Sequence, residues 1–243
     1  MKHLFFFLFT SLIFISCTND DDSTPGNNDQ DGLRLLKMET VTNNYNSDDQ
    51  STSVVDFEYN SDGKLSSKTE TKTSYSGETT VLVTDYEYED GKLIKIEYDN
   101  GDYELYTYEN NNIIESYAVG NDNTTTIIME YSYDEAGLMI QRSITVNGDC
   151  CTVDNHEYYE DGNPNYEMYF TEYDDHPTPL LLIHDPSYLK IKKLPLNNIL
   201  TKMDDVGNTE EYTYTYNSEN YPTNYEFDSE ANGQYVVREY FYE

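Results

Sequence analysis

Tryptophan is absent from the sequence, cysteine occurs three times, and basic residues number only 14 against 47 acidic ones. The cysteines are Cys17 and the adjacent pair Cys150 and Cys151. Neighbouring residues on a strand point to opposite faces, so we expect this pair to form two separate thiols. A vicinal disulfide, the alternative, would need a strained turn. Because no further thiol exists, a framework of disulfide bridges is excluded.

The scarcity of lysine and arginine restricts the partners. Cleavage after residue 16 would remove Lys2 and leave 13 basic and 47 acidic residues, a net charge of −34. Nucleic acid is excluded as a partner because phosphate contacts need stripes of basic side chains. Docking on anionic lipid is disfavoured for the same reason. The acidity predicts a solvated, self-repelling surface; diffuse calcium binding is the alternative, although no EF-hand loop is present.

Motifs for catalysis are missing as well. The sequence has no phosphate-binding glycine loop, serine nucleophile elbow, HExxH sequence or CxxC pair. Beyond the first 16 residues the histidines are His156, His176 and His184, and the last two lie near aspartates. Their spacing does not indicate a metal site, so we assign no catalytic, cofactor-binding or metal-binding residue. A hydrolase carboxylate pair remains open, because only the fold brings such a pair together.

The longest hydrophobic run stands at the start of the chain. A basic start is followed by a hydrophobic stretch of 12 residues, 4–15, and a small residue precedes Cys17. This pattern is typical of an export signal, and the stretch is too short to cross a bilayer as a helix. The sequence Phe-Ile-Ser-Cys that ends at Cys17 resembles a bacterial lipoprotein box. The resemblance implies lipidation of Cys17; an ordinary cleaved signal peptide is the alternative.

An acidic stretch follows Cys17 directly. Residues 18–22 read Thr-Asn-Asp-Asp-Asp and resemble the tract that sends lipoproteins of the Bacteroidetes to the outer face of the outer membrane. The resemblance implies a lipid-anchored outer-membrane protein exposed at the cell surface. We therefore divide the chain into a lipoprotein signal peptide (1–16), an acidic disordered tether (17–32) and a β-hairpin-repeat domain (33–243).

A repeated pattern fills this last part. Each unit is an alternating strand that ends in Tyr-x-Tyr, a turn of Asn, Asp and Gly, and a second alternating strand. The copies span residues 57–65, 86–98, 106–114, 131–140, 157–166 and 214–225. The second tyrosines of the first five are Tyr59, Tyr88, Tyr108, Tyr133 and Tyr159. Asp-Gly between alternating runs is the strongest short-range signal for a β-hairpin.

The alternation also predicts the fold. Val55, Phe57 and Tyr59 share one side of a strand whose other side carries Asp56 and Glu58. A sheet with one apolar and one polar face is typical of antiparallel structure, and no stretch shows helical periodicity over ten or more residues. We predict an all-β antiparallel meander of roughly a dozen strands. Because its apolar face needs cover, the sheet should curl into a barrel-like or folded-over form with a tyrosine-rich interior.

One segment interrupts the hairpins. Residues 174–196 contain four prolines, a compact apolar run and the cluster Lys190, Lys192 and Lys193. We interpret the segment as a short insertion, with a helix near residues 180–183, that covers an open end of the sheet. A loop that gates a ligand is the alternative.

The tyrosine-rich turns resemble the tyrosine–aspartate repeats of Rhs-type cell-surface proteins. Residues 33–243 as a whole resemble a set of Bacteroidetes lipoproteins of unknown function built from such hairpins. The most specific stretches are Tyr173 to Pro177, Asn197 to Ile199, and YTYTYNSENYP from Tyr212 to Pro222. The resemblance implies a structural role for these motifs and carries over no catalytic residue.

These observations predict a membrane-anchored cell-envelope lipoprotein that acts as a non-enzymatic binding or scaffold module. A glycan is the first ligand to consider, because tyrosine rings can stack on a pyranose. The alternatives are a carboxylate-dependent surface hydrolase and a purely structural envelope protein with a protein partner. Beyond lipidation at Cys17, the sequence identifies no site residue and no cofactor.

Overall fold

The computed structural model describes residues 32–45, 49–121, 124–166, 170–203, 207–229 and 233–243. The expected signal peptide, Cys17 and all but the last residue of the expected tether lie outside these ranges. Gly32–Glu243 forms one compact unit. None of the helices in the described part is long and apolar enough to traverse a bilayer.

The described residues form 17 strands and two short helices. The strands are β1 (Leu35–Asn44), β2 (Gln50–Tyr59), β3 (Leu65–Thr73), β4 (Thr79–Glu89), β5 (Lys92–Tyr98), β6 (Tyr103–Glu109), β7 (Asn112–Val119), β8 (Thr126–Tyr133), β9 (Met139–Val146), β10 (Asp149–Asn155), β11 (Glu157–Tyr158), β12 (Pro164–Asn165), β13 (Phe170–Pro177), β14 (Asn197–Met203), β15 (Thr209–Tyr216), β16 (Pro222–Ser229) and β17 (Gln234–Tyr242). The helices are α1 (Leu180–Ile183) and α2 (Pro186–Ile191). Short turns let the domain hold more strands than the dozen expected.

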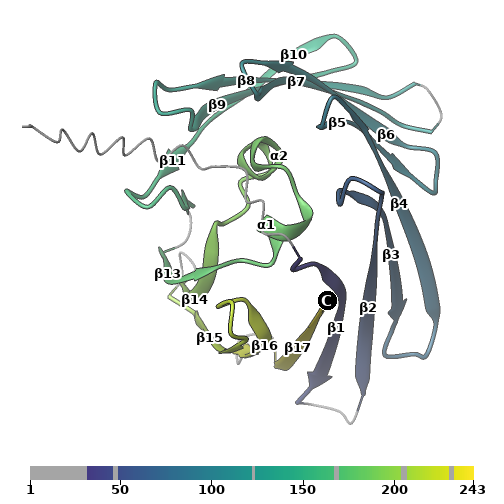
Figure 1. Ribbon diagram of the computed structural model, residues 1–243, viewed down its shortest axis with the longest axis vertical. Helices are drawn as coiled ribbons and strands as arrows, with labels where there is room; N and C mark the ends of the chain where they lie inside the picture. Colours follow the sequence, from purple (N-terminus) through teal and green to yellow (C-terminus); the bar gives the residue numbers. More distant parts are fainter. Residues whose placement is uncertain (1–31, 46–48, 122–123, 167–169, 204–206, 230–232) are drawn as a thin grey trace, which may run out of the picture. The chain divides into compact units, whose positions relative to one another are not determined.

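Fifteen of the strands form one antiparallel sheet in the order β10-β9-β8-β7-β6-β5-β4-β3-β2-β1-β17-β16-β15-β14-β13. The first and last strands, β1 and β17, pair with each other in the middle of the sheet. The sheet curls around α1 and α2, and its edge strands β10 and β13 are not paired with each other (Figure 1). The predicted all-β meander is therefore confirmed, and it is a folded-over sheet that remains open.

The predicted alternation of faces is also confirmed. Val55 and Phe57 are buried on the concave face, whereas Asp56 and Glu58 are exposed. The core on that face combines aliphatic and tyrosine side chains from many strands with residues of both helices. Burial of the rings fixes the register, because a slip of a strand by one residue would move its tyrosine side chains from the concave face to the solvent-exposed face.

The hairpins that follow the Tyr-x-Tyr strands all turn at one end of the sheet, which we call the tyrosine rim. Its turns are residues 60–64, 90–91, 110–111, 134–138, 159–163 and 217–221. In the first, the Gly63 N–H donates to the Asn60 carbonyl over 3.0 Å and Gly63 has a φ of 75°. In the last, Asn220 replaces glycine and takes a φ of 66°, since asparagine tolerates this region better than most residues.

A β-bulge accompanies these turns. The register shifts at the second tyrosine in five hairpins, namely at Tyr59, Tyr88, Tyr108, Tyr133 and Tyr216. Each shift sets the tyrosine opposite a fully buried residue, such as Leu65 or Leu93. In the fifth sequence copy the ring opposite the buried Pro164 belongs to Tyr158. Tyr159, the sequence-based choice for that copy, is therefore one residue off.

Tyrosine hydroxyls tie neighbouring strands together at this rim. They donate to backbone carbonyls in five pairs: Tyr59 to Leu35 at 2.7 Å, Tyr133 to Ile113 at 2.5 Å, Tyr173 to Pro164 at 2.9 Å, Tyr214 to Ile199 at 2.9 Å and Tyr242 to Pro222 at 2.6 Å. We call these bonds the tyrosine latches. Each gives a buried hydroxyl the partner that it needs.

The insertion enters at the tyrosine rim, between β13 and β14. Helix α1 lies where a helix was predicted, and α2 follows it, with Asp185 as N-cap accepting from the Ser187 N–H over 2.8 Å. Ile183 and Ile191 join the core of the sheet. The insertion was expected to cover an open end; instead its helices pack on the concave face, because their apolar side chains complete that core.

The small sheet β11–β12 lies in sequence between the two edge strands and is tied to the β13–β14 side. The Tyr173 hydroxyl on β13 donates to the Pro164 carbonyl on β12. The fully buried Asn163 accepts from the N–H groups of Leu196 and Asn197 over 2.8 and 3.1 Å. Side-chain hydrogen bonds thus join β11–β12 to the β13–β14 side, which it does not reach through a backbone ladder.

Candidate functional site: a hydroxyl-lined hollow on the concave face

The concave face changes character away from the tyrosine rim. Cross-strand pairing sets Thr40 opposite Ser53, Ser53 opposite Lys72, and Lys72 opposite Thr80. Directly paired residues point to the same face of a sheet, so these four side chains form one row across β1 to β4. A second row pairs Thr42 with Ser51.

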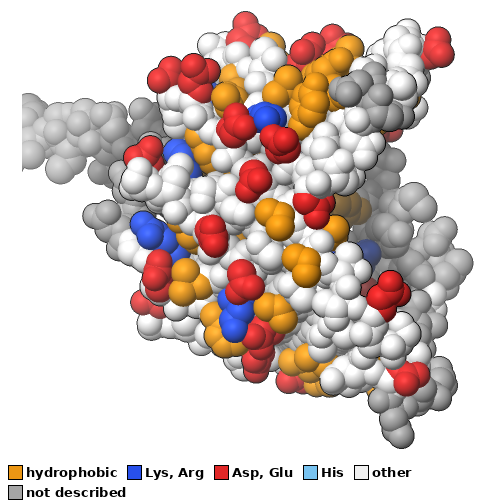
Figure 2. Space-filling model, turned by 90° about the vertical axis from the view of Figure 1, so that its right-hand side faces the viewer, with side chains coloured by type: hydrophobic (Ala, Val, Ile, Leu, Met, Phe, Trp, Pro, Cys, Tyr) orange, Lys and Arg blue, Asp and Glu red, His pale blue; other side chains and the backbone are white. Residues whose placement is uncertain are grey.

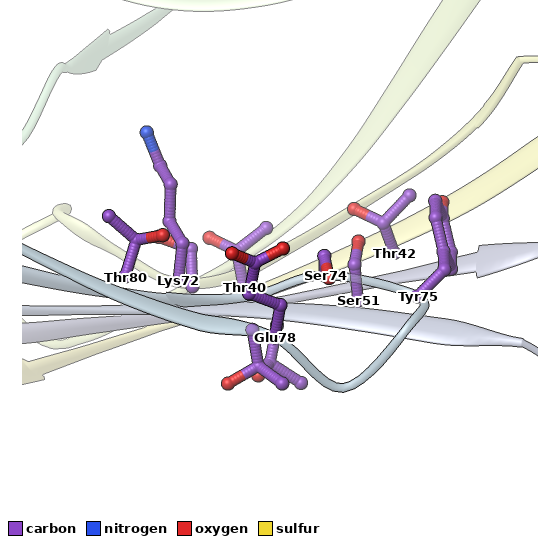
Figure 3. A pocket seen from close by; sticks show the side chains of 11 residues that line it. Thr40, Thr42, Ser51, Lys72, Ser74, Tyr75, Glu78 and Thr80 are labelled. Carbon is purple, nitrogen blue, oxygen red and sulfur yellow. The ribbon is translucent and has the colours of Figure 1, made fainter.

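These rows line a hollow of about 500 Å³ near the turn between β3 and β4. We call it the hydroxyl hollow. Thr40, Thr42, Ser51, Lys72 and Thr80 stand on the same side of the sheet (Figure 3). A hollow of this volume falls within the range of small-molecule sites.

Several of its polar groups are available to a ligand. None of the hydrogen bonds between described residues involves the side chain of Thr42, Ser51 or Thr80. Ser53 donates to Glu70 over 3.0 Å, and the Thr40 hydroxyl accepts from Arg238 over 2.8 Å. Lys72 forms an ion pair with Glu70 at 3.1 Å, and its side chain stays 53% exposed. Tyr75, at the tip of the β3–β4 hairpin, is 38% exposed and offers a ring face beside the hydroxyls.

Sequence reasoning did not single out this row. Threonine and serine on a strand are ordinary residues of a sheet, and the Tyr-x-Tyr motifs drew attention to the opposite end. The one available signal was the abundance of threonine and serine in β1 to β4.

The histidines lie in unrelated places. His184 is packed between the rings of Tyr86 and Tyr188, and burial lowers its pKa to about 4. Burial also lowers the pKa of His156, to about 4, and neither of its ring nitrogens has a partner among the described residues. No group of three or more His, Cys, Asp or Glu side chains suited to a metal occurs in the described ranges.

His176 belongs to a polar clamp made by the motif residues of the late part of the chain. Its ring lies 4.3 Å from that of Tyr216. The neighbouring Asp174 accepts hydrogen bonds from the N–H and the side chain of Asn198 and from the Tyr216 hydroxyl. The clamp joins β13, β14 and β15 at the base of the insertion, which accounts for these motifs structurally.

Two carboxyl groups in the described ranges have a displaced pKa, and ion pairs and hydrogen bonds within the fold account for it. Burial pushes the pKa of Glu104 upward, but the charge of Lys192 and hydrogen bonds from Lys192, Tyr106 and Tyr98 outweigh it, so the pKa is lowered. A hydrogen bond from Arg142 lowers the pKa of Asp154. A lowered pKa keeps a carboxyl ionised and unsuited to donate a proton to a leaving group.

The adjacent cysteines lie on β10. Cys150 is opposite Thr145 of β9, and the register shifts between Cys150 and Thr152. The bulge at this point places Cys151 out of the regular ladder.

No protein-family profile matches the sequence, and no curated protein matches it. Among solved structures, the fold is similar to that of a porin-like protein from Bacteroides uniformis, with a TM-score of 0.60 and 14% sequence identity. The match covers 86% of this chain and 98% of the other. At this identity the likeness shows a shared fold: an antiparallel meander of the kind that the Bacteroides protein adopts.

Proposed function

We propose that the protein is a lipid-anchored lipoprotein of the cell envelope that acts as a non-enzymatic binding module, with the hydroxyl hollow as its binding surface and a glycan as its ligand. The observation that carries the proposal is the row Thr40, Ser53, Lys72 and Thr80 on an otherwise tyrosine-packed concave face. Hydroxyl and ammonium groups match a ligand that itself carries many hydroxyls.

The fold supports a place in the envelope. The similar structure is described as porin-like and comes from Bacteroides, and the leader and acidic tract before the domain resemble those of Bacteroidetes lipoproteins. These two observations are independent of each other, because one concerns the fold and the other the first 22 residues.

The outer face favours a domain beside the membrane over one inside it. Exposed carboxylates follow the convex side of β2, β4 and β5, namely Asp56, Glu58, Asp85, Glu87 and Glu97. Figure 2 views the right-hand side of Figure 1 and shows acidic side chains spread over that side among hydrophobic ones. A sheet that faces lipid carries an apolar band instead. The acyl groups on Cys17 would then supply the membrane affinity.

A glycan array probed with residues 33–243 tests the ligand. We expect a hit with the unmodified domain and its loss when Lys72→Met and Tyr75→Ala are combined. Lys95→Met is the matched control, because Lys95 pairs with Glu87 and Glu97 on the convex face. A blank array, or binding that both variants retain, would contradict a glycan site in this hollow.

A purely structural envelope protein is the second candidate, and the tyrosine latches favour it. Five tyrosines that could stack on sugars are held by backbone carbonyls. The tyrosines of the latches therefore serve the fold first. A blank glycan array together with capture of an envelope protein by cross-linking in cells would favour this candidate.

A further inference from the structure

A second hollow, of about 210 Å³, lies between the insertion and the concave face of β14 to β17. We call it the arginine hollow. Four tyrosines line it: Tyr212, Tyr214, Tyr225 and Tyr240. Pro179 and Leu180 of the insertion line it as well, and Arg238 is its one cationic side chain among the described residues.

Arg238 is distinguished by its missing counter-ion. The chain has three arginines. Arg34 lies 3.6 Å from Glu243 and Arg142 lies 2.6 Å from Asp154, but no carboxylate of the described part pairs with Arg238. In a chain with 47 acidic and 14 basic residues a carboxylate partner is easy to supply. A partly buried cation without one is costly.

The contacts of Arg238 leave donors free. Its Nε donates to the Thr40 hydroxyl over 2.8 Å, and its guanidinium lies over the ring of Tyr225, 5.2 Å from the centroid. The guanidinium also hydrogen-bonds to the Tyr240 side chain. Stacking uses the face of a guanidinium, whereas its N–H groups point outward in its own plane. The N–H groups that do not bond to Thr40 or Tyr240 can therefore form hydrogen bonds that a carboxylate accepts.

We infer that the arginine hollow binds a carboxylate carried by a molecule of the size of one sugar ring, such as a uronic acid. The hollow is smaller than a drug-sized site, so it holds a single ring or an equally small group. The tyrosine rings offer flat apolar surfaces for the body of such a ligand, and Arg238 fixes its acid. This inference does not depend on the hydroxyl hollow or on its proposed glycan.

Nuclear magnetic resonance of the three arginine Nε–H groups tests the inference on the full chain in detergent. Galacturonate, galactose and sodium sulfate are titrated at constant ionic strength, because salt screens exposed charges. We expect galacturonate to shift the Arg238 signal saturably, while galactose and sulfate leave it in place. Arg34 and Arg142 are internal controls, since each is already paired.

Calorimetry with two variants completes the test. Arg238→Met should weaken galacturonate binding by roughly tenfold to a hundredfold, and Arg142→Met should bind like the wild type. An unmoved Arg238 signal, an equal shift with galactose, or an equal saturable shift with sulfate would each overturn the assignment and leave Arg238 as a structural residue. If Arg238→Met fails to fold, the wild-type titration still decides.

Discussion

In two hairpins the second tyrosine, Tyr59 or Tyr133, supplies both a ring to the core and a hydroxyl to a backbone carbonyl. The ring of Tyr59 packs against the core, its hydroxyl donates to the Leu35 carbonyl, and Arg34 lies 5.7 Å from its ring centroid. Lys64 lies in the same way over Tyr88 of the next hairpin, at 5.5 Å. A phenylalanine would keep the apolar area but leave a buried carbonyl without a donor.

His184 is expected to make stability depend on pH. Its pKa is about 4 in the folded protein and about 6.5 in an unfolded chain. The unfolded state therefore binds more protons between these values, so stability is complete above pH 6.5 and declines as the pH falls towards 4. The charges of Lys68 and Lys192 act in the same direction. The loss can reach about 3 kcal/mol.

Urea unfolding of the wild type and His184→Phe at pH 7 and at pH 4.5 measures this effect. We expect the variant to lose less stability between the two pH values than the wild type does. His176→Phe, at a side chain that is 32% exposed, is the control. Equal pH dependence in wild type and His184→Phe would show that His184 is not the responsible group.

At the scale of elements, hairpin turns and the insertion hold the sheet in shape. The turn between β4 and β5 consists of Asp90 and Gly91, with φ values of 48° and 77°. Two positive φ values are typical of the type I′ turn, whose twist matches that of the strands it joins. The insertion adds a different kind of contact, because Lys192, just after α2, pairs with Glu104 of β6 at 2.7 Å.

Gly91→Val is predicted to destabilise the domain. A Cβ at Gly91 would meet only the Lys64 Cε, at 3.8 Å, so the cost is backbone strain rather than a clash. We expect a loss of more than about 1 kcal/mol, read as a lower melting temperature. Gly91→Asn should recover part of it, since asparagine accepts positive φ. An unchanged melting temperature in Gly91→Val would contradict the turn.

Lys192→Met should also destabilise the domain, because it leaves the Glu104 carboxylate without its cationic partner. The Glu104 side chain is 16% exposed and that of Lys192 29%. Removing one partner of such a pair costs about 2–4 kcal/mol, whereas removing both charges costs less. Urea unfolding should therefore find the double variant Glu104→Gln/Lys192→Met more stable than Lys192→Met. The opposite order would mean that the pair does not hold the insertion.

At the scale of the whole molecule, the curl of the sheet encloses its concave face, and this face is apolar at one end and polar at the other. Tyrosine rings and the insertion fill it towards the tyrosine rim, and hydroxyls and Lys72 line it towards the turn between β3 and β4. The convex face carries exposed carboxylates.

The lipid anchor is a prediction about the whole chain that labelling can check. Radioactive palmitate should enter the wild type in cells and not Cys17→Ala, because we expect the acyl chains to attach at that residue alone. Cys150→Ala is the matched control and should label like the wild type. Equal labelling of Cys17→Ala would remove the anchor from the proposal.

Local sequence patterns predict much of this architecture. The alternation around Phe57 assigned faces, Asp90-Gly91 marked a turn, and the apolar run at residues 180–183 marked a helix. The buried face of β2, the turn between β4 and β5, and α1 follow these signals. Such features depend on neighbours a few residues apart, and side-chain period and turn chemistry are local properties. The leader that ends at Cys17 was recognised from local sequence pattern too, and it stays a prediction.

Only the tertiary structure decided which distant residues meet. The pairing of β1 with β17 brings Arg238 to Thr40, nearly two hundred residues away in sequence, and the row from Thr40 to Thr80 crosses four strands. Period two says that these side chains share a face but not which strands are neighbours or how far the sheet curls. Those follow from the balance of ring burial, twist and hydrogen bonding over the whole domain, and both hollows are products of that balance.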